Sequence, residues 1–218
     1  MVLIGMMRTE TTFFYDVDTQ RDFILPEGAL HGPNALAIVP TLKAVTDFAR
    51  ERQLRIVASV CRHFPGDREL KSGGGPYPDH CMNGTDGQLK IAETKPVAPL
   101  FVGNDHDLCD VEFAALIGYR GELVIEKQDL PLFSGNRNAR KLISHLFERY
   151  RDVVVYGVFT DLCVDLAVRD FAKYDRKVHV LTDAIAPLDE HNARAAIEAW
   201  KAAGIDLLSF AELRSRLR

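Results

Sequence analysis

Three side chains with complementary chemistry each follow a segment that has the pattern of a β-strand: Asp18, Lys127 and Cys163. A cysteine thiolate can attack a carbonyl carbon, and a carboxylate can take the thiol proton and return it to a leaving amine. An ammonium ion nearby favours the charged forms of both groups. Because ligands bind beyond the carboxyl ends of the strands in open α/β sheets, we expect the three groups to meet there. The pattern predicts a hydrolase that attacks an amide carbon.

The position of Cys163 supports this interpretation. A helical run follows the strand-like segment 152–158, and Cys163 falls in the first turn of that helix if Thr160 or Asp161 is the N-cap. The dipole and the unpaired N–H groups at a helix amino terminus lower a thiol pKa and can stabilise an oxyanion. We therefore expect an activated thiol at this position.

Each of the three residues also has a structural explanation when it is taken alone. An isolated cysteine after a strand is more often buried core filler, and an aspartate such as Asp18 often caps a turn or a helix. A single lysine such as Lys127 usually lies in solvent. A catalytically silent binding protein is therefore the alternative to an enzyme. The coincidence of all three groups at strand ends favours the enzyme.

The elements that must position these groups alternate along the chain. Strand-like runs occupy 11–17, 54–60, 121–127, 152–158, 177–183 and 205–210, and helical patterns occupy 40–52, 137–149, 161–174 and 190–203. Continuous apolar strands between helices are typical of a parallel sheet that is covered on both faces. We predict one domain over residues 1–218, an α/β/α sandwich of three layers with a mainly parallel, about six-stranded Rossmann-like sheet. A long loop, 62–108, is expected to lie over the site.

The composition argues against several classes of protein. The formal net charge is -4 and the pI is near 6.0, without the basic surplus of a nucleic-acid-binding protein. No apolar run approaches the roughly 18 residues of a membrane span, and the stretch MVLIGMMRTE lacks the pattern of a secretion signal. None of the 4 cysteines forms a CxxC pair, so free thiols in a reducing cytoplasm are expected.

Three motifs resemble the isochorismatase-like cysteine hydrolases and, within them, the nicotinamidases and pyrazinamidases. The motifs are DTQRDF (18–23), GPYPDHCMNGTDG (75–87) and YGVFTDLCV (156–164), and the resemblance runs from residue 11 to about residue 210. It implies an enzyme on a parallel α/β sheet, with a small-molecule substrate and without an organic cofactor. Self-association into a homo-oligomer is an expectation by analogy with the family.

The resemblance also implies roles for particular residues. Asp18 would be the general base, Lys127 its partner and Cys163 the nucleophile. A cis peptide bond is implied between Val158 and Phe159, which would direct the amides of Phe159 and Cys163 at the oxyanion.

Two aromatic residues, Phe23 and Tyr77, match the positions that flank the substrate ring in nicotinamidases. The alternative for Phe23 is ordinary core packing, and the alternative for Tyr77 is a role as a loop anchor.

The metal site of the nicotinamidases is altered in this chain. Those enzymes bind a metal through an aspartate, a histidine two residues later and a loop histidine. Here Cys61 stands at the aspartate position, while His63 and His80 match the two histidines. A thiolate with two imidazoles suits zinc better than magnesium or calcium. One divalent metal, with zinc favoured, is the hypothesis; the alternative is a site without metal, in which Cys61 only continues the strand.

Other residues near these motifs are open to interpretation. Arg62 would favour an anionic substrate if it lay at the pocket mouth, and otherwise it points to solvent. His106 and Cys109, in NDHDLCD (104–110), are a less favoured second metal pair. The segment 81–126 is longer than expected for a compact nicotinamidase, and a lid or an oligomer contact would account for it.

The first functional hypothesis is a cysteine-dependent amidohydrolase that releases ammonia from a small aromatic or heteroaromatic amide through a thioester. The alternative within the superfamily is a metal-free hydrolase of a carbamoyl or ureido compound. A vinyl-ether hydrolase is less favoured, because that chemistry does not need the cysteine.

Overall fold

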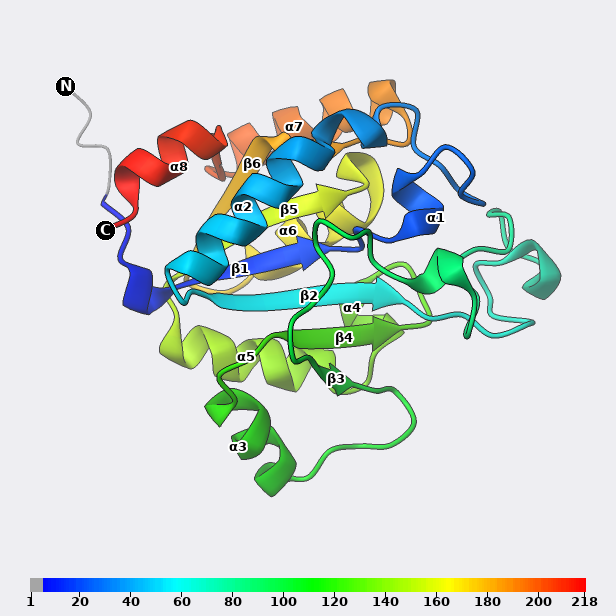
Figure 1. The fold of residues 1–218 in the computed structure, drawn as a ribbon, viewed down its shortest axis with the longest axis horizontal. Helices are drawn as coiled ribbons and strands as arrows, with labels where there is room; N and C mark the ends of the chain where they lie inside the picture. The colour runs from blue at the N-terminus through cyan, green and yellow to red at the C-terminus, as the bar shows by residue number, and fades with distance from the viewer. Residues whose placement is uncertain (1–5) are drawn as a thin grey trace.

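The protein is described over residues 6–218 by a computed structural model. Residues 1–5, half of the stretch in which no secretion signal is expected, lie outside the described range. Residues 6–218 contain a parallel sheet with the strand order β3-β4-β2-β1-β5-β6-β7 (Figure 1). The strands are β1 (Thr12–Val17), β2 (Arg55–Cys61), β3 (Leu100–Val102), β4 (Leu123–Lys127), β5 (Asp152–Val158), β6 (Lys177–Ala186) and β7 (Asp206–Leu208).

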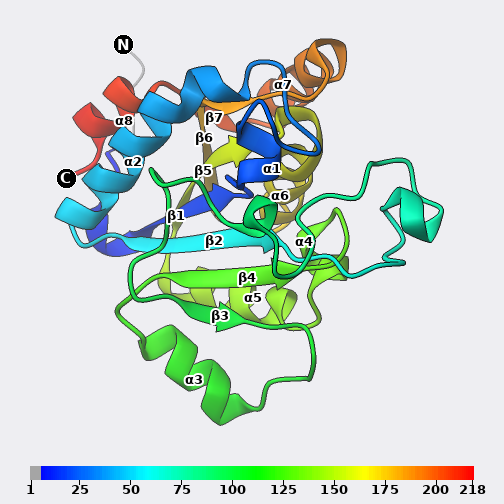
Figure 2. The same ribbon diagram turned by 45° about the vertical axis from the view of Figure 1, so that its right-hand side comes forward.

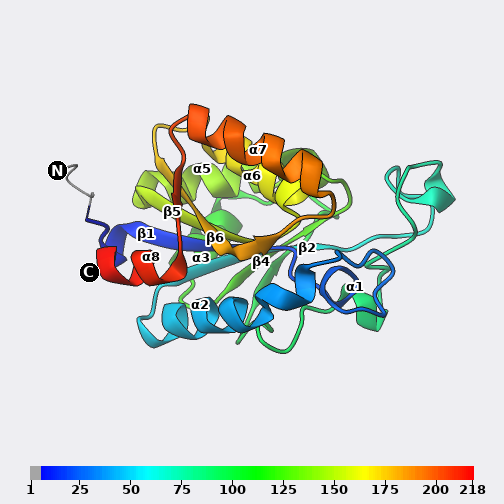
Figure 3. The same ribbon diagram turned by 90° about the horizontal axis from the view of Figure 1, so that it is seen from above.

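Helices cover both faces of this sheet. They are α1 (Arg21–Ile24), α2 (Val39–Glu51), α3 (Asp110–Gly118), α4 (Leu132–Gly135), α5 (Ala139–Arg149), α6 (Asp165–Phe171), α7 (Glu190–Ala202) and α8 (Phe210–Arg216). Figure 3 shows α2 and α8 on one side of the sheet and α5, α6 and α7 on the other. The predicted fold class is confirmed, with a parallel sheet between two helical layers. Among residues 6–218, no helix combines the length and the apolar character needed to cross a bilayer.

The central strands form because their residues are apolar on both faces. Every residue of β1, β2, β4 and β5 is buried. Successive side chains of a strand point to opposite faces, and in β1 Phe13 and Tyr15 pack toward α5 and α6, whereas Phe14 packs toward α2. Burial on both faces is the physical reason why these strands read as continuous apolar runs.

The strand order changes direction at β1. β1 pairs with β2 on one side and with β5 on the other. The chain runs from β1 to β2 in one direction and later returns to β5 on the opposite side, so the loops after β1 and β5 diverge. A reversal of this kind is where open α/β sheets bind their ligands. Asp18 and Cys163 follow these two strands.

Several elements differ from the prediction. The sheet has a seventh strand, the short edge strand β3, inside the segment 62–108 that is predicted as a loop. Leu100 and Phe101 of β3 are exposed, so the strand lacks a buried apolar pattern. The strand predicted over 205–210 ends at Leu208. Ser209 is the N-cap of α8 and forms a capping box with Glu212, so the helix begins at Phe210. The sequence pattern does not predict the short helices α1, α3 and α8.

A buried ionic cluster joins three strands at the opposite, amino end of the sheet. His179 of β6 lies between two carboxylates, with Nε2 2.7 Å from Asp152 and Nδ1 2.8 Å from Asp206. Arg216 also contacts Asp206, at 2.9 Å. Burial opposes charging of the imidazole, but the hydrogen bonds to Asp152 and Asp206 outweigh it and raise the pKa of His179. The cluster therefore holds a charged histidine between β5 and β7.

His179→Gln is expected to lower the free energy of unfolding by roughly 2 kcal/mol at pH 6, because hydrogen bonds to charged groups are lost. Since the folded-state pKa is raised, the contribution is complete below about pH 6.5, the unfolded value. It is lost as the pH rises through the higher folded-state pKa. Urea unfolding at pH 6 and pH 9 measures the effect, with exposed His191→Gln as the control. A loss of stability in His179→Gln that does not change with pH would contradict a charged His179.

Candidate active site

The structure brings Asp18, Lys127 and Cys163 together at the carboxyl edge of the sheet. Lys127 Nζ lies 3.1 Å from Asp18 Oδ2 and 3.6 Å from Cys163 Sγ. All three side chains are buried, and Lys127 is 1% exposed. Burial opposes the ammonium charge, but Asp18 and the two thiols, Cys163 and Cys61, raise the pKa of Lys127 well above its usual value. The charged form of the lysine is therefore favoured between a carboxylate and a thiol.

The turn after β1 aims Asp18 into the site. The backbone of Asp18 is in the left-handed region, with φ 48°, which an aspartate tolerates better than most residues. Ser59 of β2 donates a hydrogen bond from Oγ to Asp18 Oδ1 at 2.7 Å. The other carboxylate oxygen faces Lys127. Sequence reasoning missed Ser59, because a serine inside an apolar strand has no distinguishing signal.

Cys163 lies in a turn that differs from the predicted helix start. The peptide bond between Val158 and Phe159 is cis, and residues Thr160–Val164 form a π-helical turn that precedes α6. Burial raises the pKa of the Cys163 thiol, with Lys127 opposing this effect. The direction is opposite to the predicted lowering, because the thiol is 7% exposed and burial disfavours its charged form. The thiol needs a base, and Asp18 is the adjacent carboxylate.

Beside this triad, four buried side chains converge on one point. They are Cys61, His63, Glu69 and His80, whose nearest ligand atoms all lie within 4.8 Å of one another. Ligands of one tetrahedral zinc ion are about 3.5 Å apart, so only a small contraction would be needed. His63 Nε2 lies 2.9 Å from Glu69 Oε1, and His80 Nε2 lies 3.4 Å from the same oxygen, whereas the buried Glu69 Oε2 has no hydrogen-bond partner. An unpaired carboxylate oxygen buried beside two imidazoles and a thiol suits a bound cation.

The charges of the four residues are those that a divalent cation would balance. Burial works against every charge, but Lys127 and the two histidines lower the pKa of Cys61, and hydrogen bonds from the histidines lower that of Glu69. Cys61 and Glu69 in turn raise the pKa of His63 to about 10 and that of His80 to about 9. The two acidic groups thus favour the protonated forms of the two histidines, and one divalent ion could take the place of both added protons.

Hydrogen bonds behind the two histidines orient the rings toward this point. His63 Nδ1 lies 3.0 Å from Asp67 Oδ2, and His80 Nδ1 lies 2.8 Å from the Pro78 carbonyl. Each ring therefore turns Nε2 inward, which is the arrangement that supports metal-bound histidines.

Glu69 is a candidate ligand that sequence reasoning missed. It lies in the loop after β2, which extends beyond the carboxyl ends of the strands and returns beside α1 (Figure 2). Backbone hydrogen bonds across this loop, such as Tyr77 N to Glu69 O at 3.1 Å, bring Glu69 back toward His80. A loop glutamate is usually exposed, and only the folded loop shows that Glu69 is 6% exposed.

The two predicted substrate-flanking aromatics both lie beside His80. The ring of Phe23 is 5.2 Å from that of His80 and 5.4 Å from that of Phe159, and the ring of Tyr77 is 6.4 Å from His80. Phe23 is buried and Tyr77 is partly exposed. The two aromatic rings therefore lie beside the four-residue cluster.

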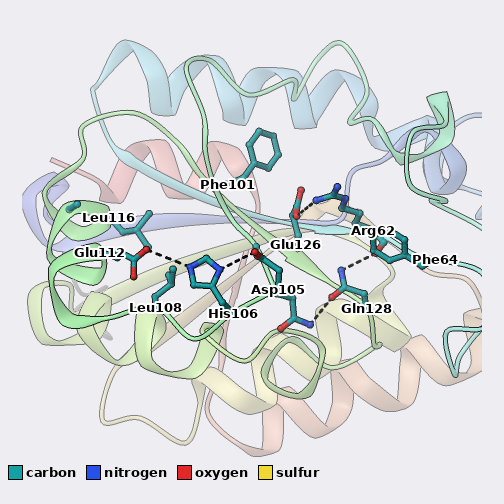
Figure 4. Close-up of a pocket in the computed structure, with 13 residues that line it drawn as sticks. Arg62, Phe64, Phe101, Asp105, His106, Leu108, Glu112, Leu116, Glu126 and Gln128 are labelled. Carbon is teal, nitrogen blue, oxygen red and sulfur yellow. Dashed lines mark hydrogen bonds and ion pairs between the residues drawn. The ribbon is translucent and has the colours of Figure 1, made fainter.

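A cavity of about 960 Å³ beside β3 is separate from this site. Figure 4 shows Arg62 turned toward Glu126 and His106 between Asp105 and Glu112. Arg62 Nη1 lies 2.7 Å from Glu126 Oε2, so the arginine is paired in this cavity and does not line the candidate active site. Within residues 6–218, the one potential metal-ligand group does not include His106 or Cys109.

Comparisons with known proteins agree with the observed fold. A family profile described as the isochorismatase domain matches residues 16–212. The chain is 28% identical to the nicotinamidase of Escherichia coli (strain K12), over 90% of this chain and 93% of that protein. It is also 28% identical to the nicotinamidase/pyrazinamidase of Mycobacterium tuberculosis, over 88% of this chain and 95% of that protein. The crystal structure of the pyrazinamidase of Pyrococcus horikoshii in complex with zinc superposes with a TM-score of 0.71, at 25% identity, over 92% of this chain and 99% of that chain.

Proposed function

The chain belongs to the isochorismatase family, and from that premise we propose that it is a cysteine-dependent amidohydrolase of a small aromatic or heteroaromatic amide. The three motifs predict family membership, and that prediction is confirmed. The class of enzyme, a hydrolase acting on C–N bonds of linear amides, is also confirmed by the two nicotinamidase relatives. The substrate, the residues and the intermediate are the proposal.

The observation that carries this proposal is the convergence on Lys127. Its ammonium lies 3.1 Å from the carboxylate of Asp18 and 3.6 Å from the sulfur of Cys163. A base, a nucleophile and a fixed positive charge thus occupy one buried site. These are the groups that acyl transfer through a thioester requires.

The proposed reaction begins with transfer of the Cys163 thiol proton to Asp18 as the sulfur attacks the amide carbon. The N–H groups of Phe159 and Cys163 donate to the oxyanion that forms. The C–N bond then breaks, and ammonia leaves with the proton from Asp18. Water attacks the resulting thioester with Asp18 as the base, which releases the carboxylic acid and restores the thiol. Lys127 keeps its charge throughout and holds Asp18 and the sulfur in place.

The proposed metal ligands are Cys61, His63, Glu69 and His80, and the proposed ion is zinc. A thiolate and two imidazoles are ligands that zinc prefers to magnesium or calcium. When bound, such an ion would supply Lewis-acid chemistry beside the triad, where the aromatic ring of the substrate would lie. Phe23 and Tyr77 would flank that ring. The convergence of four buried ligand atoms favours this proposal over the metal-free hydrolase of a carbamoyl or ureido compound.

The test measures ammonia release from nicotinamide, from benzamide and from a panel of ureido compounds, together with the metal content of the purified protein. We expect release from the aromatic amides and about one zinc per chain. A chelator should remove both the zinc and the activity, and added zinc should restore them. Ammonia release from ureido compounds alone, by a protein without metal, would support the alternative hydrolase. No release from any compound would support a silent binding protein.

A further inference from the structure

Cys61 is the last residue of β2. It pairs with Lys127 of β4 but lies beyond the last paired residue of β1. The register of β1 with β2 ends at the pair Val17–Ser59. At Asp18 the chain turns away through a left-handed conformation. Without another partner, the N–H and C=O groups of Cys61 on that side would be left unpaired. An unpaired strand end would not hold the Cys61 sulfur in a fixed place.

The side chain of Gln20 fills this gap. Its Oε1 accepts a hydrogen bond from Cys61 N at 2.7 Å, and its Nε2 donates to Cys61 O at 2.8 Å. The amide therefore pairs with both main-chain groups of Cys61 that β1 does not reach. Nε2 also donates to Gln88 O at 2.7 Å. Gln20 is 0% exposed, so these bonds form without competition from water.

The backbone around Gln20 is itself held by the loop after β2. Arg21 N donates to Leu89 O at 2.8 Å, and Ile91 N donates to Thr19 O at 3.0 Å. The Gln20 amide is thus fixed from both sides and joins the end of β1, the end of β2 and the loop. The sulfur of Cys61 lies 3.0 Å from Lys127 Nζ and also belongs to the four-residue cluster.

We propose that Gln20 is a positioning residue for the Cys61 thiolate, which it holds between the metal centre and Lys127. The inference rests on the proposed metal function of the cluster. Gln20 contacts neither the metal ligand atoms nor the reacting groups, and it acts through the backbone of Cys61. Loss of the Gln20 amide would leave Cys61 in place as a ligand, but the Cys61 sulfur could then move.

The test uses Gln20→Met, which keeps the length of the side chain and removes all three hydrogen bonds. The probes are Zn²⁺, titrated against a chromogenic chelator, and Co²⁺, whose sulfur-to-cobalt charge-transfer absorption reports the bond to Cys61. We expect zinc affinity to fall about 10- to 100-fold, as for other residues that support metal ligands. The charge-transfer absorption per bound cobalt should also fall. A role in stability alone would leave that absorption unchanged.

Gln128→Met is the matched control, because Gln128 Nε2 donates to Arg62 O, the next carbonyl along the chain, at 2.9 Å. The zinc affinity of Gln128→Met should be within about 3-fold of the wild-type value, a smaller change than that expected for Gln20→Met. Gln20→Glu keeps the acceptor for Cys61 N and loses the donors, so it should weaken zinc binding as well and serves if Gln20→Met does not fold. Wild-type zinc affinity and cobalt absorption in a folded Gln20 variant would overturn the inference. A wild-type protein that binds neither metal would instead overturn the proposed metal centre, and this inference with it.

Discussion

Cys163→Ala is expected to lower kcat/KM for amide hydrolysis by at least about 10⁴-fold, because the variant has no nucleophile and the remaining groups cannot form a thioester. Lys127 and Asp18 would still form their ion pair, so binding of the intact amide should persist. The loss should therefore appear in kcat rather than in the affinity for substrate. Steady-state ammonia release measures the first quantity, and equilibrium binding of the amide measures the second.

The control for this variant is Cys109→Ala, which removes the exposed free cysteine at the start of α3. Its activity should equal that of the wild type. Mass spectrometry of the wild type quenched during turnover should find the acyl group on Cys163. Hydrolysis by Cys163→Ala at more than about one tenth of the wild-type rate would exclude the thioester route, since loss of the nucleophile should cost far more.

Asp18→Asn is expected to lower kcat by about 10²- to 10⁴-fold, the range associated with loss of a general acid–base. The need for a base follows from burial of the Cys163 thiol, which raises its pKa. An asparagine can still accept from Ser59 Oγ, but it cannot take the thiol proton or return it to ammonia. Single-turnover acylation measures the effect directly, because it is the first step that uses the base.

Loss of a buried ion pair could also weaken the fold, and β1 offers a matched control for this effect. Asp16 lies two residues earlier and pairs with Lys90 at 3.0 Å, with both side chains buried as in the Asp18–Lys127 pair. Asp16→Asn and Asp18→Asn should lower the free energy of unfolding by similar amounts, about 3–5 kcal/mol. Only Asp18→Asn should lose acylation. Equal losses of acylation in the two variants would mean that Asp18 acts through stability alone.

The sequence by itself determined the central architecture of this protein. β1, β2, β4 and β5 are buried on both faces, so their apolar runs can be recognised as strands from the sequence alone. Parallel strands end at a common edge, and the residues that follow them could therefore be predicted to meet. For the same reason Cys61, at the end of β2, could be predicted to lie near Lys127 at the end of β4. β3 escaped prediction because a short, exposed edge strand carries no such pattern.

Only the tertiary structure decided how the residues at that edge act on one another. The convergence of Glu69 with His63 and His80 depends on how a long loop folds back, and no local periodicity encodes that path. The pKa of the Cys163 thiol is raised because burial disfavours the thiolate, and burial depends on segments that are distant in sequence. The pairing of the Gln20 amide with Cys61 likewise joins groups that are far apart in sequence. Residue types and strand ends are local properties of the chain, whereas distance, burial and charge balance arise only when distant segments pack together.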